Sequence, residues 1–203
     1  MSLLVIDFEF STKMFYGSPR AWFPEIIEVG AVLVNADGSP TDEHYSAITK
    51  PKFWPKLNDE CYGITGISQN DVENGIPLEE ALNKLQSMAP AKDTWLIAWG
   101  DSDRKVLGKV CEKYGISYPF VYENYIDFGF AYQNFNKLQR MASLKSAIEA
   151  TKVQMVGFQH SALDDAINTV LVMQKLISLG WVLEKVPLSD DYNLTNFAKK
   201  VRV

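Results

Sequence analysis

Residues 3–10 are apolar at every position except Asp7 and Glu9. A run that is apolar on both alternating faces is typical of a strand covered on both sides, as strands are in sheets that lie between layers of helices. The stretch therefore predicts a strand that is buried on both faces and carries carboxylates near its end.

Asp7 and Glu9 are two positions apart, so their side chains are expected on the same face of this strand, with Leu3 and Val5 behind them. Two ionised carboxylates beside an apolar core repel each other and lose hydration. Such a pair persists where cations or several hydrogen-bond donors compensate for this cost. A metal site is one interpretation of the pair, and an exposed strand end is the other.

The rest of the chain predicts one mixed sheet flanked by helices. Residues 25–34 and 43–49 are two more β-rich runs, and the turn sequence between them predicts an antiparallel meander. Residues 50–77 are expected to be loop with short helical pieces. Helices and short strands then alternate: a helix from Pro77, a strand over 93–99, a helix from Gly100 to Gly115, a strand and turn over 121–130, and helices over 143–150 and 162–179. This order predicts an α/β fold.

The length of 203 residues, with 47% hydrophobic and 22% charged residues, predicts one globular domain. We expect that domain over residues 1–180, with 181–203 as a C-terminal extension that packs on it or lies at an interface with a protein partner. No apolar stretch approaches the roughly 20 residues that cross a bilayer. Asp7 and Glu9 also interrupt the apolar core that a secretory signal needs. These features predict a soluble, cytoplasmic protein with no membrane contact.

Charge and cysteine content narrow the function further. The net charge is −5, from 20 basic and 25 acidic residues, which argues against binding long nucleic acid through broad electrostatics. Short or transient contact with nucleic acid stays open, because bound cations would offset the charge of an acidic site. Cys61 and Cys111 are expected to be free thiols in a reducing compartment.

Two acidic residues lie at the start of the helix that follows Gly100. Asp103 shares a face with Val106 and Leu107, so its carboxylate is expected to point inward. Asp101 does not share that face and is interpreted as a helix cap or a first-turn acid. A first-turn role is also open for Asp103.

The segment 159–166 is the most informative stretch of the chain. Ser161 and Asp164 fit a capping box, which places His160 just outside a helix and Asp165 at the end of its first turn. In that geometry His160 and Asp165 converge on one site. The alternative is that the acids only satisfy the helix N-terminus and His160 is a loop residue. His44, the other histidine, has no acidic partner at ligand spacing and is interpreted as structural or exposed.

Taken together, these motifs resemble the DEDDh branch of the 3′-to-5′ exonucleases, over roughly residues 3–178. The matching segments, in chain order, are Ile6-Asp7-Phe8-Glu9, the run from Glu25 to Ala31, the loop from Tyr62 to Ile67, Trp99-Gly100-Asp101-Ser102-Asp103 with Leu107, and the run from His160 to Ala166. The Trp-Gly-Asp form of the fourth segment is similar to a subgroup that trims histone messages and small interfering RNAs, and to its bacterial relatives.

The resemblance implies a ribonuclease-H-like fold, with a five-stranded mixed sheet whose first three strands are antiparallel. It also implies two Mg²⁺ or Mn²⁺ ions held by four carboxylates, those of Asp7, Glu9, Asp103 and Asp165. His160 would be the general base that takes a proton from the attacking water. The expected reaction is hydrolysis of the terminal phosphodiester of a single-stranded nucleic acid, with RNA favoured, releasing a nucleoside 5′-monophosphate.

Substrate contacts are expected near the first motif. Aromatic residues of the following loop, Phe15, Tyr16 and Trp22, offer faces for base stacking. The backbone of Phe10 is expected to approach the nucleotide, and by family likeness Thr65 and Ile67 would line its pocket. A modest basic region is either a solvated face or a phosphate track; it comprises Lys137, Arg140, Lys145 and Lys152.

Two alternatives remain open at this stage. The same chemistry serves a DNA proofreading or repair exonuclease, which differs in its contact to the 2′-hydroxyl of the sugar. A regulatory binding module on the same fold would engage a protein through the nucleotide pocket or the extension, without turnover.

Overall fold

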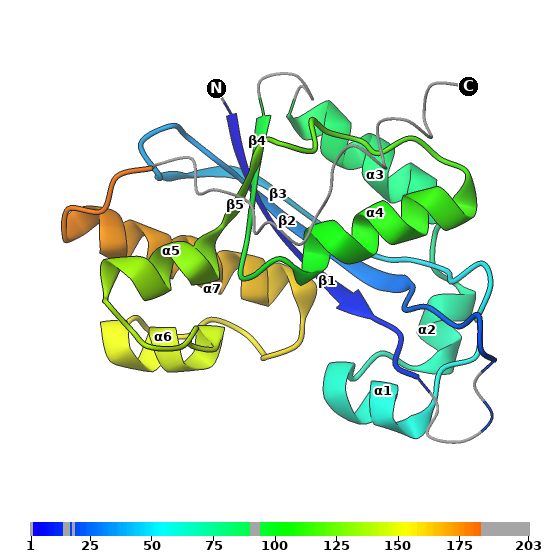
Figure 1. Ribbon diagram of the computed structural model, residues 1–203. Coiled ribbons are helices and arrows are strands. Elements are labelled where there is room, and N and C mark those ends of the chain that lie inside the picture. Colours follow the sequence, from blue (N-terminus) through cyan, green and yellow to red (C-terminus); the bar gives the residue numbers. More distant parts are fainter. Residues whose placement is uncertain (1, 14–16, 18, 90–93, 184–203) are drawn as a thin grey trace.

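The computed structural model describes residues 2–13, 17, 19–89 and 94–183, and these form a five-stranded sheet with strand order β3-β2-β1-β4-β5 (Figure 1). The strands are β1 (Ser2–Phe10), β2 (Ile26–Val34), β3 (Pro40–Ile48), β4 (Thr94–Ala98) and β5 (Tyr125–Asp127). β2 pairs antiparallel with both β1 and β3, whereas β4 pairs parallel with β1 and β5. The expected mixed sheet with three antiparallel leading strands is confirmed.

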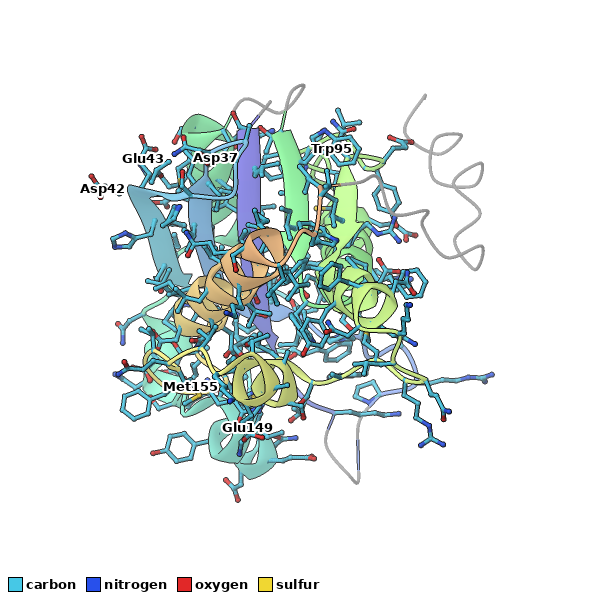
Figure 2. All side chains as sticks on the ribbon, turned by 90° about the vertical axis from the view of Figure 1, so that its left-hand side faces the viewer. Asp37, Asp42, Glu43, Trp95, Glu149 and Met155 are labelled. Carbon is cyan, nitrogen blue, oxygen red and sulfur yellow. The ribbon has the colours of Figure 1, made fainter. Side chains whose placement is uncertain are left out.

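Helices cover both faces of this sheet. They are α1 (Asp59–Thr65), α2 (Gln69–Glu73), α3 (Leu78–Met88), α4 (Ser102–Tyr114), α5 (Phe128–Phe135), α6 (Leu144–Thr151) and α7 (Ala162–Ser178). α3 and α4 lie on one face, α5, α6 and α7 lie on the other, and α1 and α2 lie beyond the end of β1 (Figure 1). Figure 2 shows α7 running across its face of the sheet.

β1 lies in the middle of the sheet and contributes to the cores on both faces. Leu4, Ile6 and Phe8 belong to the core under α3 and α4, whereas Leu3 and Val5 belong to the core under α5, α6 and α7. The predicted burial of β1 on both faces is therefore confirmed. It follows from the apolar residues at successive positions, because each face of the strand contributes to a different core.

Residues 121–130 differ from the expectation of a strand and turn. The strand β5 is limited to Tyr125–Asp127, and the helix α5 begins directly at Phe128. The Asp127 side chain accepts a hydrogen bond from the Phe130 amide at 2.9 Å and so caps the new helix. The buried residues Phe128, Ala131 and Tyr132 have the spacing of an apolar helix face. The aromatic composition of this segment favoured a strand in the sequence analysis.

The beginning of the expected C-terminal extension contacts the domain. The Trp181 ring packs edge-to-face on Phe128 with ring centroids 5.3 Å apart, and Leu183 packs against the same core. Residues 184–203 lie outside the described residues, as do Phe15 and Tyr16.

Cys61 and Cys111 are buried free thiols, as expected. Across the described part of the chain, helices are too short or too polar to span a bilayer.

A close contact between β2 and the start of α7 sets the position of that helix. A Cβ atom at Gly30 would lie 2.1 Å from the carbonyl carbon of Ala162 and 2.3 Å from the Leu163 nitrogen. Only glycine leaves room for this approach of two backbones. The Ala162 amide also donates to the Glu28 carboxylate at 3.0 Å, which ties the first turn of α7 to β2.

We predict that Gly30→Ala destabilises the protein by about 3 kcal/mol, because backbone atoms rather than a flexible side chain occupy the space of the added methyl group. Thermal or urea denaturation measures the change. Gly63→Ala is the matched control: it lies in α1 with open space around it, and should stabilise the chain by about 0.5–1 kcal/mol. Equal effects of the two substitutions would contradict the close-contact argument.

Candidate active site

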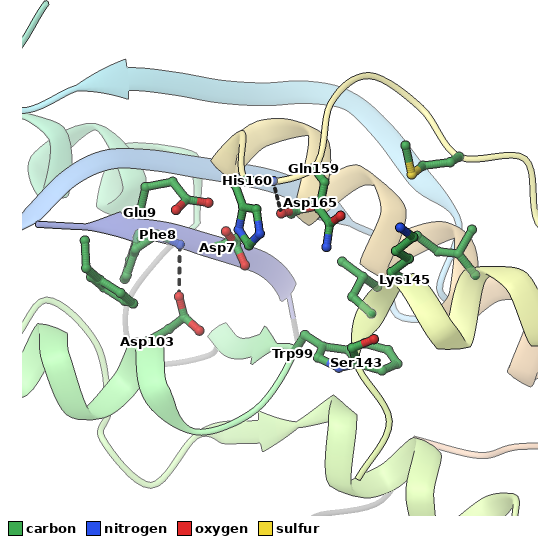
Figure 3. Close-up of a pocket in the computed structure, with 14 residues that line it drawn as sticks. Asp7, Phe8, Glu9, Trp99, Asp103, Ser143, Lys145, Gln159, His160 and Asp165 are labelled. Carbon is green, nitrogen blue, oxygen red and sulfur yellow. Dashed lines mark hydrogen bonds between the residues drawn. The ribbon is translucent and has the colours of Figure 1, made fainter. Parts of the chain in front are cut away.

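The C-terminal part of β1 has a free edge where Asp103 binds. β4 pairs with β1 only as far as Val5, which is opposite Ile97. Beyond that point the Phe8 amide donates to an oxygen of Asp103 at 2.9 Å (Figure 3). Asp103 is 4% exposed, so the inward orientation that was expected from its helical face is confirmed. Its carboxylate replaces a strand partner and is thereby held beside Asp7.

The turn that carries Asp103 is braced from behind. Asp101 occupies the N-cap position of α4, but its side chain makes no capping hydrogen bond; it pairs instead with Arg104 at 2.6 Å and Lys105 at 3.0 Å. Of the two interpretations, a helix cap or a first-turn acid, the N-cap position is confirmed, but the side chain does not bond to the helix end. Arg104 is fully buried between the rings of Tyr122 and Tyr125. Asp101 thus pairs with basic side chains of α4, whereas Asp103 faces the site.

Asp165 and His160 meet at the start of α7. The Asp165 carboxylate accepts a hydrogen bond from the His160 amide at 2.9 Å, and His160 has a left-handed φ of +64°. The expected convergence of the two residues is confirmed, but the capping box is wrong. Ser161 makes no side-chain cap, and the Asp164 carboxylate accepts from the Phe158 amide at 2.9 Å. The acids of the first turn hold the preceding loop rather than the helix end.

One cavity of about 330 Å³ brings these residues together. Its lining includes the five residues that the sequence singled out for chemistry: Asp7, Glu9, Asp103, His160 and Asp165. Ligand atoms of Glu9, His160 and Asp165 all lie within 4.8 Å of one another. Figure 3 shows the His160 ring beside the carboxylates of Asp7 and Glu9, with Asp165 next to them. Four carboxylates from one strand and two helices therefore face a single space.

Burial raises the pKa values of all four carboxylates, and neighbouring charges raise them further. Burial raises the pKa of Asp7 well above its ordinary value, and the charges of Asp103, Glu9 and Asp165 raise it further. Burial followed by Asp165 and Glu28 raises the pKa of Glu9 to about 8. Burial also raises the pKa of Asp103, to about 7, and that of Asp165. The described lining offers Lys145 and His160 as basic side chains, which leaves the site short of positive charge.

Glu28 is a supporting residue that sequence reasoning did not single out. It lies opposite Glu9 in the β1–β2 register, is 8% exposed, and accepts the Ala162 amide. Burial is the main cause that raises its pKa. Its position in an otherwise apolar strand was the available signal, because a buried carboxylate needs a partner. Here that partner is the first turn of α7.

The expected substrate residues lie in two places. Phe10 lines the cavity, whereas Thr65 and Ile67 are not among its lining residues. The Thr65 hydroxyl donates to the Cys61 carbonyl and accepts the Ile67 amide, which shapes the end of α1. From the basic region, Lys145 lines the cavity, together with Ser143 and Gln159, which the sequence had not singled out. The nucleotide contacts of Phe10, Thr65 and Ile67 stay predictions.

Comparison with known proteins gives consistent matches. The family model described as Exonuclease (RNase_T) matches residues 4–173. The chain is 36% identical to the probable 3′-5′ exonuclease KapD of Bacillus subtilis, covering 98% of this chain and 97% of KapD. It is 29% identical to human ERI1 exoribonuclease 2, covering 95% of this chain but only 31% of that relative.

Solved structures agree with this result. The nuclease domain of 3′hExo, a DEDDh family member bound to rAMP, is similar with a TM-score of 0.77 and 26% identity, covering 91% of this chain and 97% of that domain. A structure of exonuclease I, at a TM-score of 0.70 and 13% identity, shares the fold. The sheet, its flanking helices and these matches are those of the ribonuclease-H-like fold. The chain therefore belongs to the RNase_T exonuclease family and is a 3′-to-5′ exonuclease of the DEDDh type.

Proposed function

We propose that the chain trims the 3′ ends of single-stranded RNA and releases nucleoside 5′-monophosphates, with two divalent cations held by Asp7, Glu9, Asp103 and Asp165. The observation that carries this proposal is the convergence of four carboxylates and one imidazole on a single cavity that lacks balancing positive charge. The enzyme class follows from the family; the substrate sugar, the ions and the residue roles are the proposal.

The donor set fits hard divalent cations. Carboxylate oxygens are the ligands that Mg²⁺ and Mn²⁺ prefer. Burial, followed by neighbouring carboxylates, raises the pKa of Glu9, so bound cations would stabilise its ionised form. When bound, such ions supply Lewis acidity and stabilise charge on the phosphodiester oxygens. Asp103 uses one oxygen to accept the Phe8 amide, so its other oxygen remains for an ion.

His160 is suited to take the proton of the attacking water. Its ring lies beside Glu9 and Asp165, and its backbone is held by the Asp165 carboxylate. The side chain is exposed, so a proton accepted on the ring can pass to solvent. An imidazole titrates close to neutral pH, where a general base is most effective.

RNA is favoured because of the similar proteins. Human ERI1 exoribonuclease 2 is named for activity on RNA, and the 3′hExo nuclease domain was solved with rAMP. The Trp-Gly-Asp sequence before Asp103 resembles the same subgroup. The terminal nucleotide is expected to lie at the end of the cavity near Glu9 and Phe10, toward Thr65 and Ile67.

We expect the purified chain to shorten 5′-labelled single-stranded RNA from its 3′ end with Mg²⁺ or Mn²⁺ but not with EDTA. Matched DNA should be shortened more slowly. Asp7→Ala should abolish the ladder, because it removes a carboxylate from the centre of the cavity. A ladder that survives Asp7→Ala would refute the assigned site. Faster cleavage of DNA would favour the repair or proofreading alternative.

His160→Ala should lower kcat about 10²- to 10⁴-fold with little change in KM, since a positioned general base contributes about that much. Steady-state kinetics on the same RNA measure both constants. His44→Ala is the matched control, because His44 is exposed on β3 and does not line the cavity. Comparable losses from both histidine variants would argue against this role for His160.

Metal-free protein should lose thermal stability as the pH rises. The folded chain keeps a proton on Glu9 up to about pH 8, whereas an ordinary glutamate releases its proton near 4.5. The folded state therefore binds more protons in this window, so its stability is greatest below the window and falls through it. Added Mg²⁺ should raise Tm more near pH 8 than near pH 5, because it binds the ionised carboxylates.

Thermal melts in EDTA across this pH range test the prediction. Glu9→Gln should flatten the decline, because an amide has no proton to lose. A Tm that rises with pH in EDTA would contradict the proposed crowding of charge.

A further inference from the structure

Phe158 is an exposed aromatic residue next to the candidate active site. Its side chain is 82% exposed, the highest value among the large hydrophobic residues of the described chain. It directly precedes Gln159 and His160, which both line the cavity, and Met155 of the same loop lines it as well. An apolar ring left this open beside a cavity is available to a ligand.

The loop that carries Phe158 is held by α7 through alternate residues. The Val156 amide and carbonyl both bond the side chain of the fully buried Asn168, each at 2.9 Å. The Phe158 amide donates to Asp164 and the His160 amide to Asp165. The backbone around Phe158 is therefore fixed by the same helix that carries Asp165. Because the backbone is fixed, only the side-chain rotamers of Phe158 must be ordered when a ligand binds, which lowers the entropic cost of binding.

The cavity has two chemically different ends. The carboxylates of Glu9 and Asp103 lie toward one end, those of Asp7 and Asp165 lie in the middle beside His160, and Lys145 and Ser143 lie toward the other end (Figure 3). Met155 lies on the segment beside α6 (Figure 2). Since the terminal nucleotide is expected near Glu9 and Phe10, the end with Lys145 faces the rest of the strand. A cation and an apolar ring there match a phosphate and a base.

We propose that Phe158 stacks on a base of the substrate strand on the 5′ side of the scissile phosphodiester, and that Lys145 contacts a phosphate of the same strand. This inference rests on the proposed function and names where the strand leaves the site. A nucleic acid suits this surface better than a protein does, because the surface is continuous with the catalytic cavity and carries Lys145. Stacking is tolerant of base identity, as trimming of varied 3′ ends requires.

Steady-state kinetics of Phe158→Ala on single-stranded RNA test the stacking contact. We expect KM to rise about tenfold while kcat changes less than about twofold, since stacking on an aromatic side chain contributes about this much per base. Phe158→Trp should restore the wild-type KM, whereas Phe158→Leu should behave like Phe158→Ala. The p-nitrophenyl ester of uridine 5′-monophosphate, which has no upstream base, should show little change in KM.

Lys145→Gln should raise KM on RNA. It should also lower the slope of log KM against log salt concentration by about one, because one phosphate contact is lost. Leu179→Ala is the control variant. Leu179 is an exposed apolar residue, 58% accessible, at the opposite end of α7 from His160. It should leave both kinetic constants at their wild-type values.

The outcomes separate the two levels of inference. If the wild-type chain cleaves no RNA or DNA, the proposed function fails. If it cleaves RNA but Phe158→Ala leaves KM unchanged, the stacking proposal is overturned and the ring serves another partner. The proposal would also be overturned if Phe158→Ala lowered kcat and Phe158→Leu kept the wild-type kcat, because the residue would then act only by supporting His160.

Discussion

Crowding of carboxylates at the C-terminal end of β1 costs free energy, because Asp7, Glu9, Asp103 and Asp165 repel one another in a partly buried space. A chain keeps such an arrangement only if the rest of the structure holds the groups in place. Burial raises the pKa values of Glu9 and Asp103, and for Glu9 the charges of Asp165, Glu28 and Asp103 raise it further. Divalent cations bound by these carboxylates would offset this cost.

The surrounding fold supplies the restraint. β1 is packed against cores on both faces, which fixes the backbone positions of Asp7 and Glu9. Gly30 allows α7 to approach β2 at backbone contact, and Glu28 binds the first turn of that helix. Asp103 is held by the Phe8 amide, which is free because β4 ends early. Three parts of the chain thus hold the four acids: β1 carries Asp7 and Glu9, α4 carries Asp103, and α7 carries Asp165.

Much of the site was readable from residue types and spacing. Alternation placed Asp7 and Glu9 on one face, helical spacing turned Asp103 inward, and the helix start at Ser161 brought His160 near Asp165. The capping box was wrong because Asp164 binds the Phe158 amide instead, a contact that depends on how the loop folds back. α5 was missed because an aromatic run has weak helical propensity, and tertiary packing of Phe128 and Tyr132 decided its conformation.

The sequence by itself determined the α/β fold, the buried strand and the local orientation of its acidic residues, because apolar periodicity and charge are local properties of a chain. Only the tertiary structure decided which groups share the cavity and what supports them. Glu28 became a partner of α7, Lys145 came to line the cavity, and Phe158 was left exposed beside it. These facts depend on contacts between residues far apart along the chain. The residue pattern of a single sequence does not show which distant residues come close together in space.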